Sequence, residues 1–162
     1  MTARHAHRTR GFTLIEMIVV VMMVGILASA AMPLAALHKR RAQEADLRQA
    51  LRTVRTALDD YKRAWDQGRI EKKADETGYP PSLEVLVQGV PDATSPKGER
   101  IYFLRRLPRD PFADDPSLPA AATWGLRSYA SPPDAPAPGK DVFDVHVLRD
   151  GVAMDGTSYR DW

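Results

Sequence analysis

The side chains that could do chemistry in this chain are few and scattered. Among its 162 residues there is no cysteine, which excludes disulfides, thiolate metal sites and a cysteine nucleophile. Of the four histidines, His5 and His7 lie together near the N-terminus, whereas His38 and His146 are far from them and from each other. The chain also lacks HExxH, GxSxG, a Walker glycine loop and CxxC. We therefore expect no enzyme active site, and we expect His146 to have a structural role.

One carboxylate is conspicuous because of its surroundings. Between Phe12 and Leu37, Glu16 is the only ionisable side chain. A carboxylate inside an apolar span costs about 2.5–3.5 kcal/mol on insertion scales, and such groups are usually paired and functional. The alternative is that Glu16 lies at the water interface, where the cost is small. If proteolysis freed the amino group of Phe12, that group would be the nearest cation. If this amino group paired with Glu16 of an adjacent copy of the chain, a one-step slip between the copies would leave both charges buried and unpaired.

The basic charge of the chain is concentrated before this apolar run. The net charge is +2 and the sequence pI is near 9.0, but three arginines precede residue 12. Without Arg4, Arg8 and Arg10 the net charge becomes −1. The rest of the chain therefore has the charge of an ordinary solvated domain, and we expect no nucleic-acid partner.

A second basic cluster lies in the C-terminal half. Arg105, Arg106 and Arg109 are close in sequence, and Asp110 follows them directly. The balanced charge of the domain predicts salt bridges here in preference to phosphate binding.

The run from residue 12 to residue 37 is longer than the roughly 20 residues that cross a hydrocarbon core. A basic head before an apolar stretch is also typical of a secretory signal peptide, with cleavage after Ala28-Ser29-Ala30. Residues 11–16, Gly-Phe-Thr-Leu-Ile-Glu, favour a retained helix, because here the sequence resembles the type IV pilins and pseudopilins. The resemblance implies a leader of residues 1–11 that a prepilin peptidase removes after Gly11. It also implies that Phe12 is the N-methylated mature terminus and that Glu16 is an assembly residue.

The apolar run predicts a helix that continues beyond Leu37. Its expected parts are a membrane or filament-core helix over 12–37 and an amphipathic helix over 38–68, with Gly68 as the stop. Pro33 should kink the first part, and we count it among the assembly residues. One apolar stripe recurs at steps of three and four residues, at Leu47, Leu51, Val54, Leu58, Tyr61 and Trp65. On the outer faces, two acid-to-base pairs are expected, Glu44 with Arg48 and Asp59 with Arg63.

Residues 69–162 should form a globular domain of short elements, because 12 of the 13 prolines follow Tyr79. Ser82 is the expected cap of a short helix over 83–88 that Gly89 ends. Strands are predicted over 100–107, 124–129 and 141–148, with an exposed loop over 131–139 between the last two.

A second resemblance narrows the family to the major pseudopilins of type II secretion, the GspG type. The residues that carry it lie in segments 78–84, 102–112, 124–129 and 141–145 and in the terminal Asp161-Trp162. The block Leu-Pro-Arg-Asp-Pro-Phe, residues 107–112, is its most specific internal part. The resemblance implies an α+β fold in which a long N-terminal helix packs on a small antiparallel sheet.

This family typically binds calcium in a C-terminal loop, and the sequence departs from its pattern there. The weak calcium candidates are Asp150, Asp155 and Asp161, but Tyr159-Arg160 stands where acids are expected. Calcium takes six to eight oxygen ligands, and Arg160 would repel it. We therefore favour the absence of a cofactor, with calcium as the alternative: Asp155-Gly156 should form a turn, and Arg160 should pair with a local carboxylate.

The resemblance implies a structural subunit of a periplasmic pseudopilus that drives protein export. The chain would be a single-pass inner-membrane protein with its globular domain in the periplasm. The implied partners are other copies of the chain, prepilin peptidase, an inner-membrane platform with its ATPase, minor pseudopilins and an outer-membrane secretin. One alternative is a pilin of a type IV pilus or of DNA uptake, although such pilins often carry a C-terminal disulfide. Another is a membrane-anchored periplasmic enzyme or binding protein.

Overall fold

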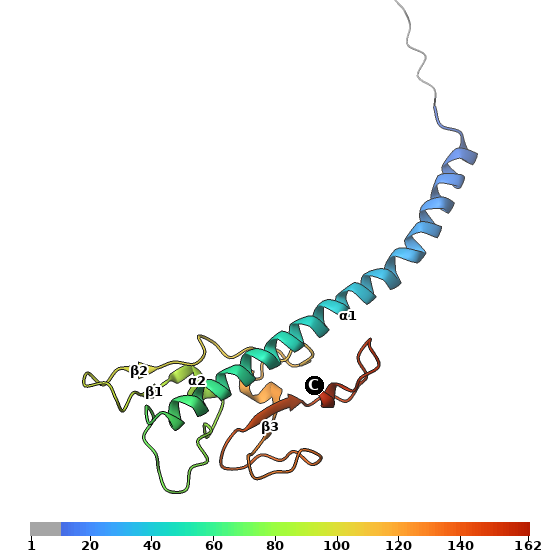
Figure 1. Cartoon of the computed structure of the whole chain (residues 1–162). Coiled ribbons are helices and arrows are strands. Elements are labelled where there is room, and N and C mark those ends of the chain that lie inside the picture. Colours follow the sequence, from blue (N-terminus) through green and yellow to red (C-terminus); the bar gives the residue numbers. More distant parts are fainter. Residues whose placement is uncertain (1–10) are drawn as a thin grey trace, which may run out of the picture. The chain divides into compact units, whose positions relative to one another are not determined.

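The computed structural model describes residues 11–162, and of residues 30–33 it describes the backbone alone. The leader expected before Gly11 lies outside the described residues. The chain divides into two compact units between Arg40 and Arg41. Its elements are, in order (Figure 1), α1 (Leu14–Asp66), α2 (Glu84–Gln88), β1 (Val90–Pro91), β2 (Arg100–Ile101), η1 (Ala120–Thr123), β3 (Trp124–Arg127), β4 (Asp144–Val147) and η2 (Tyr159–Asp161).

The predicted long helix is confirmed as α1, which has 53 residues. The helix runs through Pro33 without a break. The side chain of Pro33, where a kink was expected, lies outside the described residues. Gly68 ends the helix as predicted: its φ is 74°, and the amide of Arg69 donates to the carbonyl of Ala64 at 2.9 Å. A left-handed residue with such a backward hydrogen bond is a common helix terminator.

The apolar stripe of α1 forms one side of the core of the second unit. Leu47 and Val54 are fully buried, and Trp65 at the end of the stripe is partly buried. The rest of the chain contributes the other side of the core with Ile70, Leu83, Leu86, Trp124, Val142, Val145, Val147, Ala153 and Tyr159. The helix beyond Arg41 is therefore stabilised mainly by packing of its apolar face.

The two acid-to-base pairs expected on the outer faces of α1 are not formed. Glu44 is not on an outer face, because only 5% of it is exposed. Arg48 pairs instead with Asp155, and Arg63 pairs with Asp60.

The expected antiparallel sheet is present as two separate two-stranded sheets. β1 pairs with β2 through Val90 and Ile101, and β3 pairs with β4 from Trp124 opposite Val147 to Arg127 opposite Asp144. β1 was not predicted. The strand predicted over 100–107 stops at Ile101, because the amides of Phe103 and Leu104 both donate to the carbonyl of Leu86. Those donors are then lost to the sheet.

The short helix α2 begins later than predicted and without the expected cap. Its N-cap is Leu83, which makes no side-chain hydrogen bond, so the role assigned to Ser82 is wrong. Gly89 ends the helix as predicted, with a φ of 72°. A Cβ atom on Gly89 would lie 2.7 Å from the carbonyl oxygen of Ile101, so the approach of β2 also requires glycine here.

The third predicted strand is also shortened. It was expected over 141–148, but β4 pairs only over Asp144–Val147. The segment before it is held differently: the carboxylate of Asp141 accepts hydrogen bonds from the Ser128 hydroxyl at 2.7 Å and the Tyr129 amide at 2.9 Å. Residues 131–139 form the predicted loop between β3 and β4.

Candidate assembly helix and C-terminal loop

The N-terminus of α1 is capped by a residue that the sequence analysis did not assign. The hydroxyl of Thr13 accepts a hydrogen bond from the backbone amide of Glu16 at 3.3 Å, and its carbonyl accepts from the amide of Met17 at 3.2 Å. Thr-x-x-Glu is the sequence pattern of a capping box, so the signal was available. Glu16 therefore lies in the first turn, where the helix dipole favours a negative charge.

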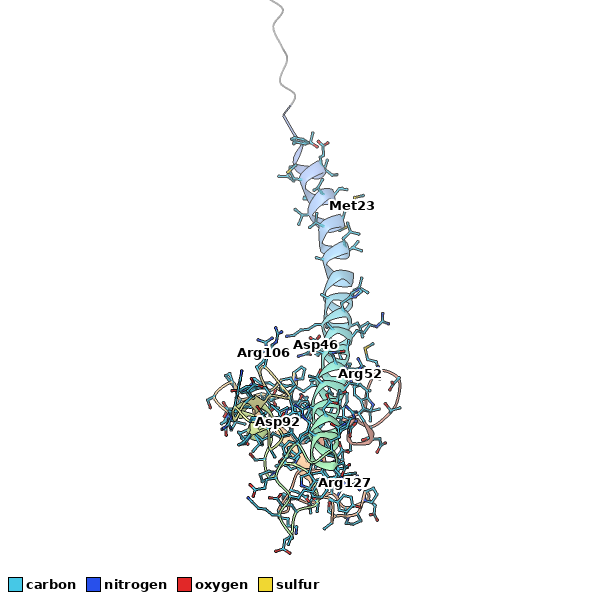
Figure 2. All side chains as sticks on the ribbon, turned by 60° about the vertical axis from the view of Figure 1, so that its left-hand side comes forward. Met23, Asp46, Arg52, Asp92, Arg106 and Arg127 are labelled. Carbon is cyan, nitrogen blue, oxygen red and sulfur yellow. The ribbon has the colours of Figure 1, made fainter. Side chains whose placement is uncertain are left out.

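The N-terminal part of α1 carries exposed apolar side chains. Each large apolar side chain from Phe12 to Leu27 is between 45% and 79% exposed. Figure 2 shows side chains projecting from both sides of the ribbon around Met23. Among the described residues, α1 is the one helix long and apolar enough to cross a membrane, and none of its apolar window is buried. This apolar part of α1 therefore does not belong to the core of the globular unit, and its surface requires lipid or protein around it.

The two residues expected at the processing site lie just before the helix. Gly11 and Phe12 are exposed and outside regular secondary structure. A Cβ atom on Gly11 would meet nothing within 4 Å. The bond between them is thus accessible and lies outside the helix.

The carboxylates of the C-terminal loop are already engaged by other groups. One oxygen of Asp155 accepts from the amide of Thr157 at 3.0 Å and from its hydroxyl at 2.6 Å. Its other oxygen binds the guanidinium of Arg48. The Thr157 hydrogen bonds, with a contribution from Arg48, lower the pKa of Asp155 below its usual value of 3.8. The turn predicted at Asp155-Gly156 is confirmed, and Gly156 has a φ of 87°.

The pairing expected of Arg160 is also confirmed. Its guanidinium lies 2.6 Å from the carboxylate of Asp150. No three acidic or histidine side chains among residues 11–162 gather in a metal-binding arrangement. Of the three weak calcium candidates, Asp150, Asp155 and Asp161, a guanidinium binds each of the first two carboxylates.

Sequence reasoning missed the deepest contact of this loop. The carboxylate of Glu44 accepts from the Tyr159 hydroxyl at 2.8 Å and from the Met154 amide at 3.0 Å. A signal was present, because Glu44 precedes Leu47 by three residues and so extends the apolar stripe by one step. The C-terminal segment, residues 150–162, therefore lies against α1 (Figure 1).

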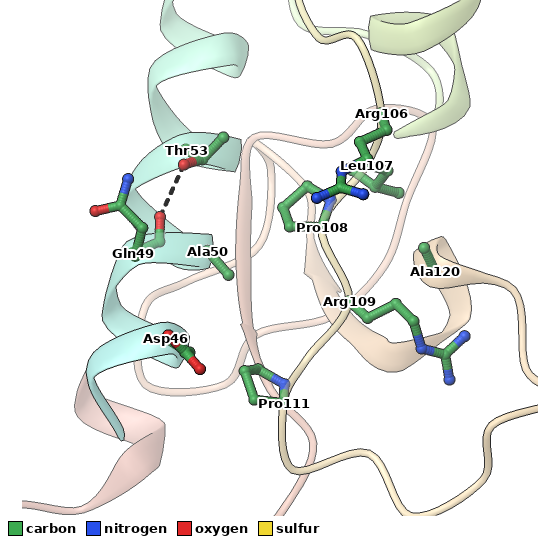
Figure 3. A pocket seen from close by; sticks show the side chains of 10 residues that line it. All are labelled: Asp46, Gln49, Ala50, Thr53, Arg106, Leu107, Pro108, Arg109, Pro111 and Ala120. Atoms are coloured by element: carbon green, nitrogen blue, oxygen red, sulfur yellow. Dashed lines mark hydrogen bonds between the residues drawn. The ribbon is translucent and has the colours of Figure 1, made fainter. Parts of the chain in front are cut away.

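A groove of about 560 Å³ separates α1 from the segment 106–111 (Figure 3). Asp46, Ala50 and Thr53 line it on the helix side. The salt bridges predicted for the basic cluster are not formed. Arg109 extends away from α1 and donates to the carbonyls of Leu118 and Asp115.

The other two arginines of the basic cluster also lack the predicted salt bridges. Within the described part of the chain, Arg105 and Arg106 have no carboxylate at ion-pair distance. Asp110 is buried and accepts from the amide of Phe112 at 2.8 Å. Burial raises the pKa of Asp110 above its usual value.

Two features define a pilin-like protein. The first part of α1 is an exposed apolar helix with Glu16 in its capped first turn, and the second part of the same helix packs in a globular unit. Residues 6–32 match the family described as the prokaryotic N-terminal methylation motif. The chain is 30% identical over 136 residues to the type II secretion system core protein G of Klebsiella michiganensis, covering 82% of this chain and 88% of that protein. It is 32% identical over 159 residues to the protein of the same name from Vibrio cholerae, covering 94% and 90%. For that of Escherichia coli K12 the identity is 30% over 116 residues, covering 69% and 72%.

The chain belongs to the family of type II secretion system core protein G, the major pseudopilins. The resemblance drawn from the sequence is thus confirmed, and so are the α+β fold and the class of pseudopilus structural subunit. No solved structure gives a significant match.

Proposed function

We propose that the chain is made as a prepilin, cut after Gly11, N-methylated at Phe12 and polymerised into a periplasmic pseudopilus that drives protein export. The observation that carries the proposal is the exposed apolar part of α1, with Glu16 in the first turn, which Thr13 caps. Before assembly the inner membrane surrounds this helix. In the polymer, helices of neighbouring copies replace the lipid.

The exchange of lipid for protein cannot depend on hydrophobicity, because lipid tails are as apolar as the helix. It depends on close packing and on polar pairs between helices. Glu16 supplies one such polar group, and the amino group that cleavage creates at Phe12 supplies its partner. Pairing between adjacent copies fixes their stagger, since a slipped register leaves both charges buried and unpaired.

The proposed work of the protein is mechanical and not catalytic. Growth of the fibre pushes the exported protein toward an outer-membrane secretin. The partners are prepilin peptidase, an inner-membrane assembly platform with its ATPase, minor pseudopilins and further copies of this chain. The globular unit faces the periplasm, and the N-terminal leader faces the cytoplasm.

The mass of the mature protein tests the processing step. We expect intact mass spectrometry of the membrane-extracted protein to give a chain that starts at Phe12 and carries one additional methyl group. A start at Ala31 would identify a removed signal peptide, and a start at Met1 would identify an uncleaved anchor. Either result would overturn the proposal.

Variants of Glu16 test the assembly step and separate the charge from the cap. Glu16→Gln keeps a side chain suited to a capping box but removes the charge. We expect Glu16→Gln to abolish incorporation into the fibre, measured by crosslinking of adjacent copies, while membrane insertion persists. Thr13→Ala is the matched control, because it removes the hydroxyl bound to the Glu16 amide and keeps the carboxylate. Equal losses in both variants would reduce the role of Glu16 to helix capping.

A further inference from the structure

We propose that two arginines, Arg48 and Arg160, hold the C-terminal segment in place without a metal ion, in the loop where this family is expected to use calcium. The inference concerns the folded unit after Arg41 and does not depend on fibre assembly. It rests on the contacts of two carboxylates, Asp150 and Asp155, and on the ring at the end of the chain.

Arg48 of α1 contacts the C-terminal segment at two residues that are themselves linked by hydrogen bonds. Its guanidinium binds Asp155 and also lies 4.0 Å from the ring centroid of Trp162. The indole nitrogen of Trp162 donates to the Thr157 hydroxyl at 2.7 Å, and that hydroxyl donates to Asp155. The contacts therefore form a ring that links Arg48, Trp162, Thr157 and Asp155. One cation on the helix orders both the turn at 155–157 and the last residue of the chain.

Arg160 closes the same segment at its other end. Residues 151–159 fold back on themselves, with the amide of Tyr159 donating to the carbonyl of Gly151 at 3.1 Å. A bridge between Val152 and Ser158 lies inside this fold. The ion pair of Arg160 with Asp150 joins the two residues just outside it. A cation that a calcium-binding loop would take from solution is thus provided by the chain itself.

A calcium ion could not enter this arrangement without breaking it. One oxygen of Asp155 accepts two hydrogen bonds from Thr157, and the other binds Arg48. The carboxylate of Asp150 binds Arg160. Calcium needs six to eight oxygens, several of them from carboxylates, and would have to displace both guanidinium groups to obtain them.

Amide hydrogen exchange of the full chain in detergent micelles tests the proposal. We expect the exchange of residues 150–162 in the wild-type protein to be the same with a calcium chelator and with added calcium chloride. We expect Arg48→Gln to accelerate exchange in that segment roughly 5- to 20-fold, because an ion pair and a cation–π contact are lost. Arg52→Gln is the matched control, since Arg52 lies one turn further along α1 and, within residues 11–162, donates to Gln49 alone.

Arg160 is tested with a pair of variants. Arg160→Gln should accelerate exchange roughly 2- to 5-fold, and Arg160→Lys should restore most of the protection because it keeps the charge beside Asp150. Faster exchange of the wild-type protein in chelator, or slower exchange in calcium, would overturn the proposal. So would variants of Arg48 and Arg160 that exchange like Arg52→Gln. If a variant fails to fold, calorimetric titration of the wild-type chain with calcium decides, and heat of specific binding would contradict the proposal.

Discussion

Glu44 and Tyr159 are separated by 115 residues and are joined by a 2.8 Å hydrogen bond between buried side chains. The same carboxylate accepts from the backbone amide of Met154. A buried carboxylate is tolerated when donors of this kind satisfy it. The second half of α1 and the end of the chain are therefore parts of one core. Loss of the hydrogen bond from Tyr159 or from Met154 to Glu44 should destabilise both segments.

Replacement of Glu44 should be one of the more damaging single changes in the helix. Glu44→Ala leaves the Tyr159 hydroxyl and the Met154 amide without this acceptor, and we expect a loss of about 2–3 kcal/mol in the free energy of unfolding. Denaturant unfolding in detergent, followed by tryptophan fluorescence, measures it, because all three tryptophans lie after Arg41. Asp46→Ala, an exposed acid two residues away, is the control. A loss no larger than that of the control would contradict the role assigned to Glu44.

Gly125 should be intolerant of a side chain for a reason unrelated to backbone conformation. It lies opposite His146 in the β3–β4 register, and a Cβ atom there would come within 2.2 Å of the imidazole Nε2 atom. Gly125→Ala should destabilise the globular unit by about 1–3 kcal/mol through overpacking. His146→Ala on the same background should recover part of that loss. Additive losses in the double variant would show that the imidazole is not the obstacle.

The sequence predicted the elements that periodicity and stop signals define, and it failed where tertiary contacts compete for the backbone. The stripe from Leu47 to Trp65 and the stops at Gly68 and Gly89 are local patterns, and the structure confirms them. The strand after Arg100 was overextended, because no local pattern shows that the carbonyl of Leu86 takes the amides of Phe103 and Leu104.

The candidate site divides in the same way between local and long-range information. The pairing of Arg160 with a local carboxylate was predictable, because its partner, Asp150, is close in sequence. The partner of Arg48 was not, because Asp155 is 107 residues away. The local alternative, Glu44, has the right spacing for a helical pair, but burial commits it to Tyr159.

Asp141 should be a second sensitive carboxylate, with a dependence on pH that can be stated in advance. It is 5% exposed and accepts from Ser128, the amide of Tyr129 and the Thr77 hydroxyl. Burial opposes its ionisation, but these hydrogen bonds outweigh it and lower the pKa below the usual 3.8. Asp141→Ala should cost about 2–3 kcal/mol in the free energy of unfolding at neutral pH.

The sign of the effect at low pH follows from the lowered pKa of Asp141. The stabilisation is present above the unfolded value near 3.8 and is lost as the pH falls below it. The wild-type protein should therefore lose part of its advantage over Asp141→Ala in acid. Asp134→Ala, at an exposed position of the neighbouring loop 131–139, should match the wild type throughout. A penalty for Asp141→Ala that persists unchanged below pH 3 would rule out the carboxylate as its source.

His146 should make the globular unit less stable in mild acid. Burial lowers the pKa of its imidazole below 6.5, Asp144 opposes this shift, and Arg160 and Arg55 add to it. The unfolded chain therefore binds a proton at a pH at which the folded chain does not, and stability falls as the pH drops below about 6.5. The decline from this group ends once the pH is below the folded pKa. Denaturant unfolding at a series of pH values between about 7.5 and 5 should show the decline in the wild type, and His146→Gln should remove it, because glutamine does not titrate. An unchanged slope in His146→Gln would assign the pH dependence to another group.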